Sequence, residues 1–377
     1  MTEPPAEPPL VTRPDAPAPP RPRPGFLEAV LWCLVFVAVL MAGAVAAVVV
    51  VFLAYALAAP EPGKFANEQL DALVKATAPN ADGPRPPVPF EIGQALAWGM
   101  LAAQFASLAL VALVVPRRIG KDWKREIGVR RPHWLHVLLV LLIVPGFMIT
   151  SDLIQALFIW ASGMQPPQVL KALNSVFGRF PWPLTVLAVA VGPGVLEELW
   201  CRGFLGRGLC GRYGIAAGVL LTAVLFAAMH LDPSQVVVIA CMGCFLHFVY
   251  FATRSIWMPI LLHTANNGLA ILLALTLKQA DSGDAAPMPV IVRIVGLSLI
   301  LFGSVALWSS RAELEPLTRK DEAWWEEGEW KPESPGISAP PPDANVRLAH
   351  AVVSPAALMF TLLSFGVLMY LAYRFSQ

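Results

Sequence analysis

The stretch Pro193-Gly194-Val195-Leu196-Glu197-Glu198-Leu199-Trp200-Cys201-Arg202 sets two adjacent carboxylates and an arginine at the end of an apolar run. That run, Trp182 to Leu196, has the composition of a membrane-spanning helix. Ionisable side chains are costly at membrane depth, so they usually face the protein interior, are paired and serve a function. The stretch therefore predicts a membrane protein with a charged site inside it.

The spacing of the charged residues divides them into two sets. Glu198 and Arg202 are four residues apart, so on a helix they share a face and can form an ion pair that neutralises itself. Glu197 points about 100° away from Glu198 and needs a different partner. Gly192-Pro193-Gly194 predicts a kink just before it, because a proline leaves a backbone carbonyl one turn back without its N–H. We expect such a kink to admit water to Glu197.

The composition is that of a polytopic membrane protein. Of the 377 residues, 56% are hydrophobic and 14% charged, whereas a soluble domain carries about 25% charged residues. No basic tract with interleaved aromatics supports a nucleic-acid partner. The odd number of cysteines, five, argues against a disulfide framework. Cys241, Cys244 and His247 could be read as a metal site, but the packing of small residues between helices is the favoured interpretation.

Nine apolar segments of spanning length predict an all-α fold, a polytopic transmembrane helical bundle of eight or nine spans with the site inside it. They cover about 26–59, 92–115, 134–161, the span that begins at 182 and carries the opening stretch, 215–230, 234–252, 256–277, 289–309 and 351–373. A proline-rich polar loop is expected between the first two.

These segments divide the chain into six parts. They are a disordered proline-rich tail (1–25), N-terminal transmembrane helices and connectors (26–180), a helical core with the charged site (181–280), an additional transmembrane helix (281–310), a polar Trp-containing connector (311–350) and a C-terminal transmembrane helix (351–377). The tail contains no apolar stretch of the kind that a signal peptide needs.

The positive-inside rule predicts a cytoplasmic N-terminus, because arginines of the tail and of the cluster 117–131 are separated by two spans. From a count of nine full spans, we do not expect Arg207, Arg212, Arg254 and the connector after Arg311 all to lie on that side. One of the later segments could therefore be re-entrant. The Ala/Val/Pro-rich composition suggests a bacterial inner membrane.

A geometric argument identifies the partner of Glu197. Glu197 lies 15 residues before the turn at 212–213 and His230 lies 17 residues after it, which gives heights of about 22 and 25 Å in an antiparallel hairpin. His263 and Asn267 share a face of a later helix, roughly 13 to 20 Å above its turn. One carboxylate, two histidines and an amide are therefore expected to meet at comparable depth.

This set of groups is suited to hydrolysis of a peptide bond. A carboxylate and an imidazole on either side of a water form a general-base arrangement, and a second histidine with an amide can donate to an oxyanion. No Gly-x-Ser-x-Gly motif is present, so a covalent nucleophile is not expected. Glu197, His230 and His263 could instead form a zinc site. The cofactor is therefore either none or zinc.

Three motifs occur in order: Glu197-Glu198-x-x-x-Arg202, Phe226-x-x-x-His230 and His263-x-x-x-Asn267. They resemble the motifs of the CPBP intramembrane proteases, the family of CAAX prenyl endopeptidases and bacteriocin-processing (Abi) proteins. The resemblance covers about 183–273.

The resemblance implies a role for each motif residue. Glu197 would activate water with His230 as its partner, and His263 with Asn267 would stabilise the oxyanion. The remaining two motif residues, Glu198 and Arg202, would support the site. The implied partners are the bilayer and a membrane-embedded or lipid-anchored peptide or protein. The family has been described both as metal-dependent and as glutamate-based, so it does not choose the cofactor.

Two other classes of function compete with a protease. One is a non-catalytic immunity or scaffold protein that keeps the fold and acts by binding. The other is a transporter that uses the buried charges as a relay, although the chain has no visible internal repeat of hydropathy or motif.

Overall fold

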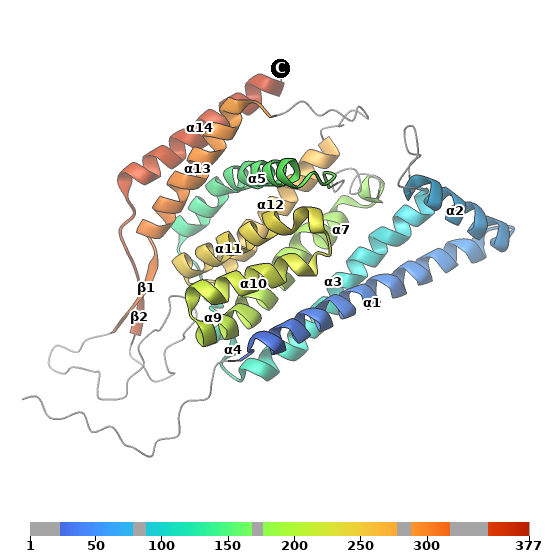
Figure 1. Ribbon diagram of the computed structural model, residues 1–377, viewed down its shortest axis with the longest axis horizontal. Coiled ribbons are helices and arrows are strands. Elements are labelled where there is room, and N and C mark those ends of the chain that lie inside the picture. Colours follow the sequence, from blue (N-terminus) through green and yellow to red (C-terminus); the bar gives the residue numbers. More distant parts are fainter. Residues whose placement is uncertain (1–22, 78–87, 168–175, 277–287, 317–345, 377) are drawn as a thin grey trace, which may run out of the picture.

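The computed structural model describes residues 23–77, 88–167, 176–276, 288–316 and 346–376. In these ranges the chain is a bundle of helices with one two-stranded antiparallel ribbon, so the prediction of an all-α bundle is confirmed (Figure 1). Nearly all of the proline-rich tail (1–22) and the middle of the Trp-containing connector (317–345) lie outside the described residues.

The described elements follow the predicted segments closely. In chain order they are α1 (Phe26–Ala58), α2 (Pro62–Thr77), α3 (Phe90–Ile119), α4 (Trp123–Glu126), α5 (Trp134–Ser162), α7 (Trp182–Val186), η1 (Leu187–Val191), α8 (Gly192–Glu198), η2 (Leu199–Gly206), α9 (Arg207–Tyr213), α10 (Ile215–Met229), η3 (Pro233–Gln235), α11 (Val236–Thr253), α12 (Trp257–Thr276), α13 (Val290–Ser309), β1 (Ala312–Pro316), β2 (Val346–His350) and α14 (Pro355–Ser376).

Each of the nine predicted spans forms a helix or a continuous series of helical segments. Seven of the helices in the described ranges are long and apolar enough to cross a membrane, and one of these seven is the series from Trp182 to Tyr213. The apolar helix α10 has only 15 residues, which corresponds to about 22 Å. It is thus shorter than the hydrocarbon core of about 30 Å.

The region between the first two spans differs from the expected loop. Residues Pro62–Thr77 form the helix α2, whose polar and apolar side chains lie on different faces. Phe65 in this helix packs on Phe52 of α1, with ring centres 6.2 Å apart. The prolines at both ends of the region suggested a loop, but the residues between them have helical periodicity and an apolar surface to pack against.

The helices α1 and α3 pack side by side through small residues. A Cβ atom added to Gly43 would lie 2.7 Å from the Cβ of Ala106, so the two helices approach as closely as glycine allows. Towards its N-terminus, α1 also packs on η2, where Phe36 lies 5.2 Å from Trp200 between ring centres. These contacts place the charged stretch against α1, which is itself packed on α3.

The basic residues gather at one end of the bundle. Contacts there join Arg118 to Glu28, Arg207 to Glu126 at 2.6 Å, Ser255 Oγ to the carbonyl of Arg130 at 2.8 Å, and Arg254 Nε to the carbonyl of Ala312 at 3.0 Å. These residues lie at or next to the starts of α1, α9 and α12 and the ends of α3 and α11, together with α4 and β1 (Figure 1). We call residues 117–136, 207–213, 254–256 and 310–312 the basic end.

The expectation that these arginines could not all share one side was therefore wrong. Arg207 lies at the basic end through Glu126, and Arg254 lies there through Ala312. The physical reason is simple: antiparallel helices return the chain to the same end after every second crossing. No re-entrant segment is needed to bring these residues together.

Candidate active site

The helix that carries the two glutamates departs from α-helical geometry on both sides of them. The segments η1 (Leu187–Val191) and η2 (Leu199–Gly206) are π-helical, and α8 lies between them. Short π-helical segments within α-helices are frequent at functional sites. Pro193 is part of the cause, because it offers no N–H to the carbonyl of Val189 four residues earlier.

The carbonyl that Pro193 leaves free has a partner. Asn267 Nδ2 donates a hydrogen bond to the carbonyl oxygen of Val189, at 3.2 Å. This bond joins α12 to the irregular part of the glutamate helix. That water enters beside Pro193 stays a prediction.

Glu198 and Arg202 form the ion pair that their spacing predicts. Arg202 Nη1 lies 2.8 Å from Glu198 Oε1, and both side chains are fully buried. The guanidinium also donates to the carbonyl of Gly243 at 3.0 Å and lies over the ring of Phe226, 4.6 Å from its centre. Such a buried pair needs these further contacts, because burial removes the water that would otherwise solvate both charges.

The pair does not satisfy Glu198 by itself, contrary to the sequence-based interpretation. His263 Nδ1 lies 2.9 Å from Glu198 Oε1, so one carboxylate oxygen binds both the arginine and a histidine. A carboxylate can accept several hydrogen bonds, and an arginine one turn away does not use them all. That acceptor capacity is the signal that could have linked His263 to Glu198.

Glu197 faces the two histidines. Its Oε2 atom lies 3.9 Å from His230 Nε2 and 4.0 Å from His263 Nε2, which is longer than a hydrogen bond. The same oxygen is buried and has no hydrogen-bond partner. The hairpin with nearly equal arms thus brings Glu197 and His230 together, and His263 joins them from α12.

Hydrogen bonds fix which nitrogen of each ring faces Glu197. His230 Nδ1 lies 2.9 Å from the carbonyl oxygen of Phe226, and an acceptor at this position requires the proton on Nδ1. His263 Nδ1 is fixed in the same way by the Glu198 carboxylate. In a neutral ring, the Nε2 atom of either histidine therefore carries a lone pair that points towards Glu197.

These donor atoms are of the type that zinc takes, namely two imidazole nitrogens and one carboxylate. As the side chains are placed, however, no group of three or more His, Cys, Asp or Glu residues in the described part of the chain could hold a metal ion. As placed, these residues therefore do not fit a metal ion.

Phe226 has a larger part in the site than helix packing alone. Its ring lies edge-on to His230 at 4.9 Å and to His263 at 6.1 Å between centres, and its face covers the Arg202 guanidinium. The ring is almost fully buried. The motif Phe226-x-x-x-His230 places the phenyl group one turn before the histidine, which is the sequence signal for this contact.

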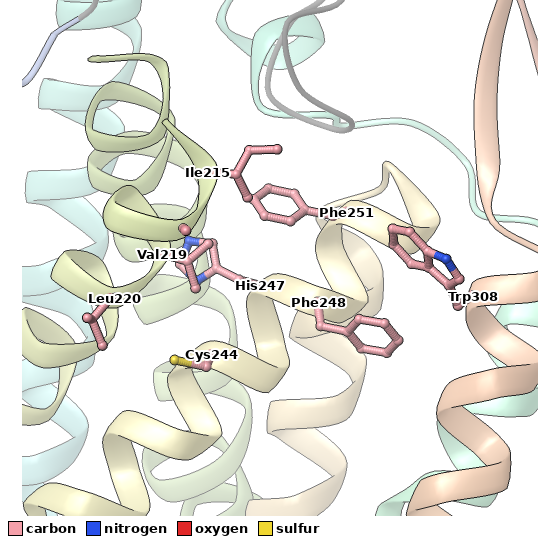
Figure 2. A pocket seen from close by; sticks show the side chains of 9 residues that line it. Ile215, Val219, Leu220, Cys244, His247, Phe248, Phe251 and Trp308 are labelled. Atoms are coloured by element: carbon pink, nitrogen blue, oxygen red, sulfur yellow. The ribbon is translucent and has the colours of Figure 1, made fainter. Parts of the chain in front are cut away.

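His247 shares an acceptor, the carbonyl of Gly243, with Arg202 of the site. His247 Nδ1 bonds the carbonyl of Gly243 at 3.1 Å, one turn back on its own helix. With Cys244 it lines an apolar pocket of about 340 Å³ between α10, α11 and Trp308 (Figure 2). None of the six predicted site residues lines this pocket.

Gly194 allows α8 and α12 to pack at the distance that the site requires. A Cβ atom at this position would lie 2.2 Å from Thr264 Oγ1 and 3.0 Å from the Thr264 backbone nitrogen. The adjacent residue on α12 is His263. Any side chain at Gly194 must therefore push apart the helices that carry Glu197 and His263.

We expect Gly194→Ala to destabilise the protein by about 1–3 kcal/mol, the usual range for overpacking, and to lower activity. Gly268→Ala on α12 is the matched control, because nothing lies within 4 Å of a Cβ there. Thermal unfolding in detergent measures both. Equal stability of the two variants would contradict the close packing of α8 on α12.

The comparisons with known proteins concern the same segment. Residues 179–269 match the family described as type II CAAX prenyl endopeptidase Rce1-like, and these residues include all six predicted site residues. This match supports a protease of the CPBP family. One curated relative is the protein named "Putative membrane peptidase YdiL" from Bacillus subtilis (strain 168). It is 24% identical over 182 residues, which cover 47% of this chain and 71% of the relative.

No solved structure matches the chain. The family and the relative together support an intramembrane protease as the general class of the chain. The bundle of membrane-spanning helices agrees with that class.

Proposed function

We propose that this protein is an intramembrane endopeptidase that hydrolyses a peptide bond in a membrane-associated protein, with Glu197 and His230 activating the water. One observation carries the proposal: the buried Glu197 Oε2 has no hydrogen-bond partner and faces the Nε2 atoms of two histidines. A water about 2.8 Å from each atom can bond both Glu197 and His230, since these atoms are 3.9 Å apart.

The first step moves one proton and forms one bond. The water donates one hydrogen bond to Glu197 Oε2 and a second hydrogen bond to the lone pair of His230 Nε2. Glu197 takes its proton as the water oxygen attacks the carbonyl carbon of the scissile bond. The carbonyl oxygen becomes an oxyanion. The proton then passes from Glu197 to the amide nitrogen, the C–N bond breaks, and a carboxylic acid and an amine result.

His263 and Asn267 stabilise the oxyanion. For this role His263 Nε2 must carry a proton in addition to the one on Nδ1, which is hydrogen-bonded to the Glu198 carboxylate. Glu198 and Arg202 therefore support the reaction by holding and orienting His263. Of the two N–H groups on Asn267 Nδ2, the bond to Val189 uses one. The other is the donor assigned to the oxyanion.

Asn267 thus has two roles that an experiment can separate. We expect Asn267→Ala to lower stability by about 1–3 kcal/mol, because the carbonyl of Val189 loses its partner. Adding Pro193→Ala supplies a backbone N–H to the same carbonyl and should restore part of the stability. Activity of the double variant should stay low if the amide also binds the oxyanion. Recovery of activity together with stability would show that Asn267 acts only through its hydrogen bond to the carbonyl of Val189.

A comparison of peptide termini in living cells tests the proposed activity. Membranes from cells with the intact chain and from cells with Glu197→Gln are compared by terminal proteomics. We expect specific new termini that disappear in the variant. Identical termini would instead favour the non-catalytic alternative, an immunity or scaffold protein that acts by binding.

The zinc-dependent form of the same protease is the remaining alternative. Because the described side chains do not fit a metal as placed, we expect activity to be unchanged after exhaustive chelation. Elemental analysis of the active protein should find no stoichiometric zinc. Loss of activity on chelation, with recovery on addition of zinc, would replace the glutamate-based mechanism by the metal-based one.

A further inference from the structure

The candidate site and the basic end lie at different ends of α10. This helix begins at Ile215, directly after the basic end, and finishes at Met229, one residue before His230. At 1.5 Å per residue the distance along the helix is about 22 Å. The connection between α10 and α11, residues 230–235, thus lies at the opposite end of these helices from the basic end (Figure 1).

Exposure of the site residues increases towards that far side. The side chains of Glu198 and Arg202 are fully buried, that of His263 is 6% exposed, that of Glu197 15% and that of His230 34%. The most accessible member of the site is therefore the one at the end of α10, next to the loop. Substrate and water reach Glu197 most directly past His230.

Packed side chains close the route from the basic end. Between the glutamates and the basic end, η2 contains four buried side chains, each 2% exposed or less: Trp200, Cys201, Phe204 and Leu205. They pack on Phe36 and Trp32 of α1. A substrate from the basic end would have to pass through this core.

The loop next to His230 is polar and ordered by its own contacts. Asp232 accepts hydrogen bonds from Ser234 and from Gln235 Nε2, the latter at 2.6 Å, and these bonds lower the pKa of its carboxyl group. Gln155 of α5 donates to the carbonyl of Ser234 at 2.7 Å. A polar loop of this kind suits contact with water better than contact with lipid tails, where polar side chains are costly.

We propose that the site opens to the non-cytoplasmic face of the membrane. The positive-inside rule places the end with the clustered Lys and Arg residues in the cytoplasm, and the open side of the site is the opposite one. The substrate class is then a protein whose scissile bond lies near the non-cytoplasmic end of a membrane-spanning or outer-leaflet segment. In this orientation a lipid-anchored chain terminus in the cytoplasm does not reach the site. The substrate part rests on the proposed protease function, whereas the orientation does not.

Cysteine labelling in intact cells tests the orientation. Pro233→Cys reports the loop beside His230, and Lys121→Cys, which is exposed at the basic end, is its matched control. Both are made in the full chain with Cys241→Ala, because Cys241 is the one exposed native cysteine. We expect a membrane-impermeant maleimide to label Pro233→Cys in intact cells and Lys121→Cys only after permeabilisation. The reverse pattern would overturn the proposal.

The peptide termini that depend on Glu197 provide an independent readout of the substrate class. They should map to non-cytoplasmic ends of membrane proteins. Termini that map to the cytoplasmic side would overturn the inference and leave the protease function intact. A third outcome is the expected labelling pattern with no termini that depend on Glu197. In that case the proposed orientation would hold and the proposed protease function would be wrong.

Discussion

Glu197→Gln is expected to lower the rate of peptide hydrolysis by about 10²- to 10⁴-fold, the usual contribution of a general base. Glutamine keeps the shape of the side chain but cannot take a proton from water. Stability should change little or rise slightly. Glu197 Oε2 is buried without a hydrogen-bond partner, so the replacement removes an unpaired charge and breaks no hydrogen bond of this atom. Turnover of a membrane substrate and thermal unfolding of the same preparation measure the two effects.

The neighbouring glutamate provides the control. Glu198→Gln should also lower activity, but it should do so with a clear loss of stability because Arg202 loses the charge with which it is paired. The two variants differ by one position on the same helix. Full activity of Glu197→Gln would exclude the general-base role, and a large loss of stability in this variant would show that Glu197 has a structural partner.

Arg202→Met is expected to have the largest effect on stability, about 3–5 kcal/mol. The methionine leaves Glu198 as a buried carboxylate without its counter-ion, and breaking a buried pair from one side costs about this much. The carbonyl of Gly243 also loses its donor. The change is measured as a fall in unfolding temperature and in the yield of folded protein from membranes.

A double variant separates charge from packing. Glu198→Gln with Arg202→Met removes both charges, while the glutamine oxygen can still accept from His263 Nδ1. We expect it to be more stable than Arg202→Met alone, because no isolated charge remains. If the double variant were as unstable as the single one, the cost would come from lost packing of the arginine against Phe226.

Local helix geometry made several features predictable. The ion pair of Glu198 and Arg202 follows from a spacing of four residues. The approach of His230 to Glu197 follows from two hairpin arms of nearly equal length. The freed carbonyl of Val189 follows from the chemistry of Pro193, although its partner Asn267 comes from another helix.

Other features depend on how helices distant in sequence are packed. The bond between His263 and Glu198 needs α12 to lie on α8, and a glycine at 194 allows that approach. The position of Arg207 and Arg254 at one end was missed because counting spans gives no contact between connectors. The helix α2 was missed because proline content dominated the interpretation of its region.

By itself, the sequence determined the membrane-spanning class, the order of the spans and the identity of the charged and histidine side chains around Glu197. These follow from hydropathy and from the periodicity of a single helix. Only the tertiary structure decided that Glu198 holds His263, that one oxygen of Glu197 faces the Nε2 atoms of two histidines, and that His230 is more exposed than the other residues around Glu197. The reason is that such contacts depend on the tilt and rotation of helices, which are set by packing between neighbours and not by any one segment.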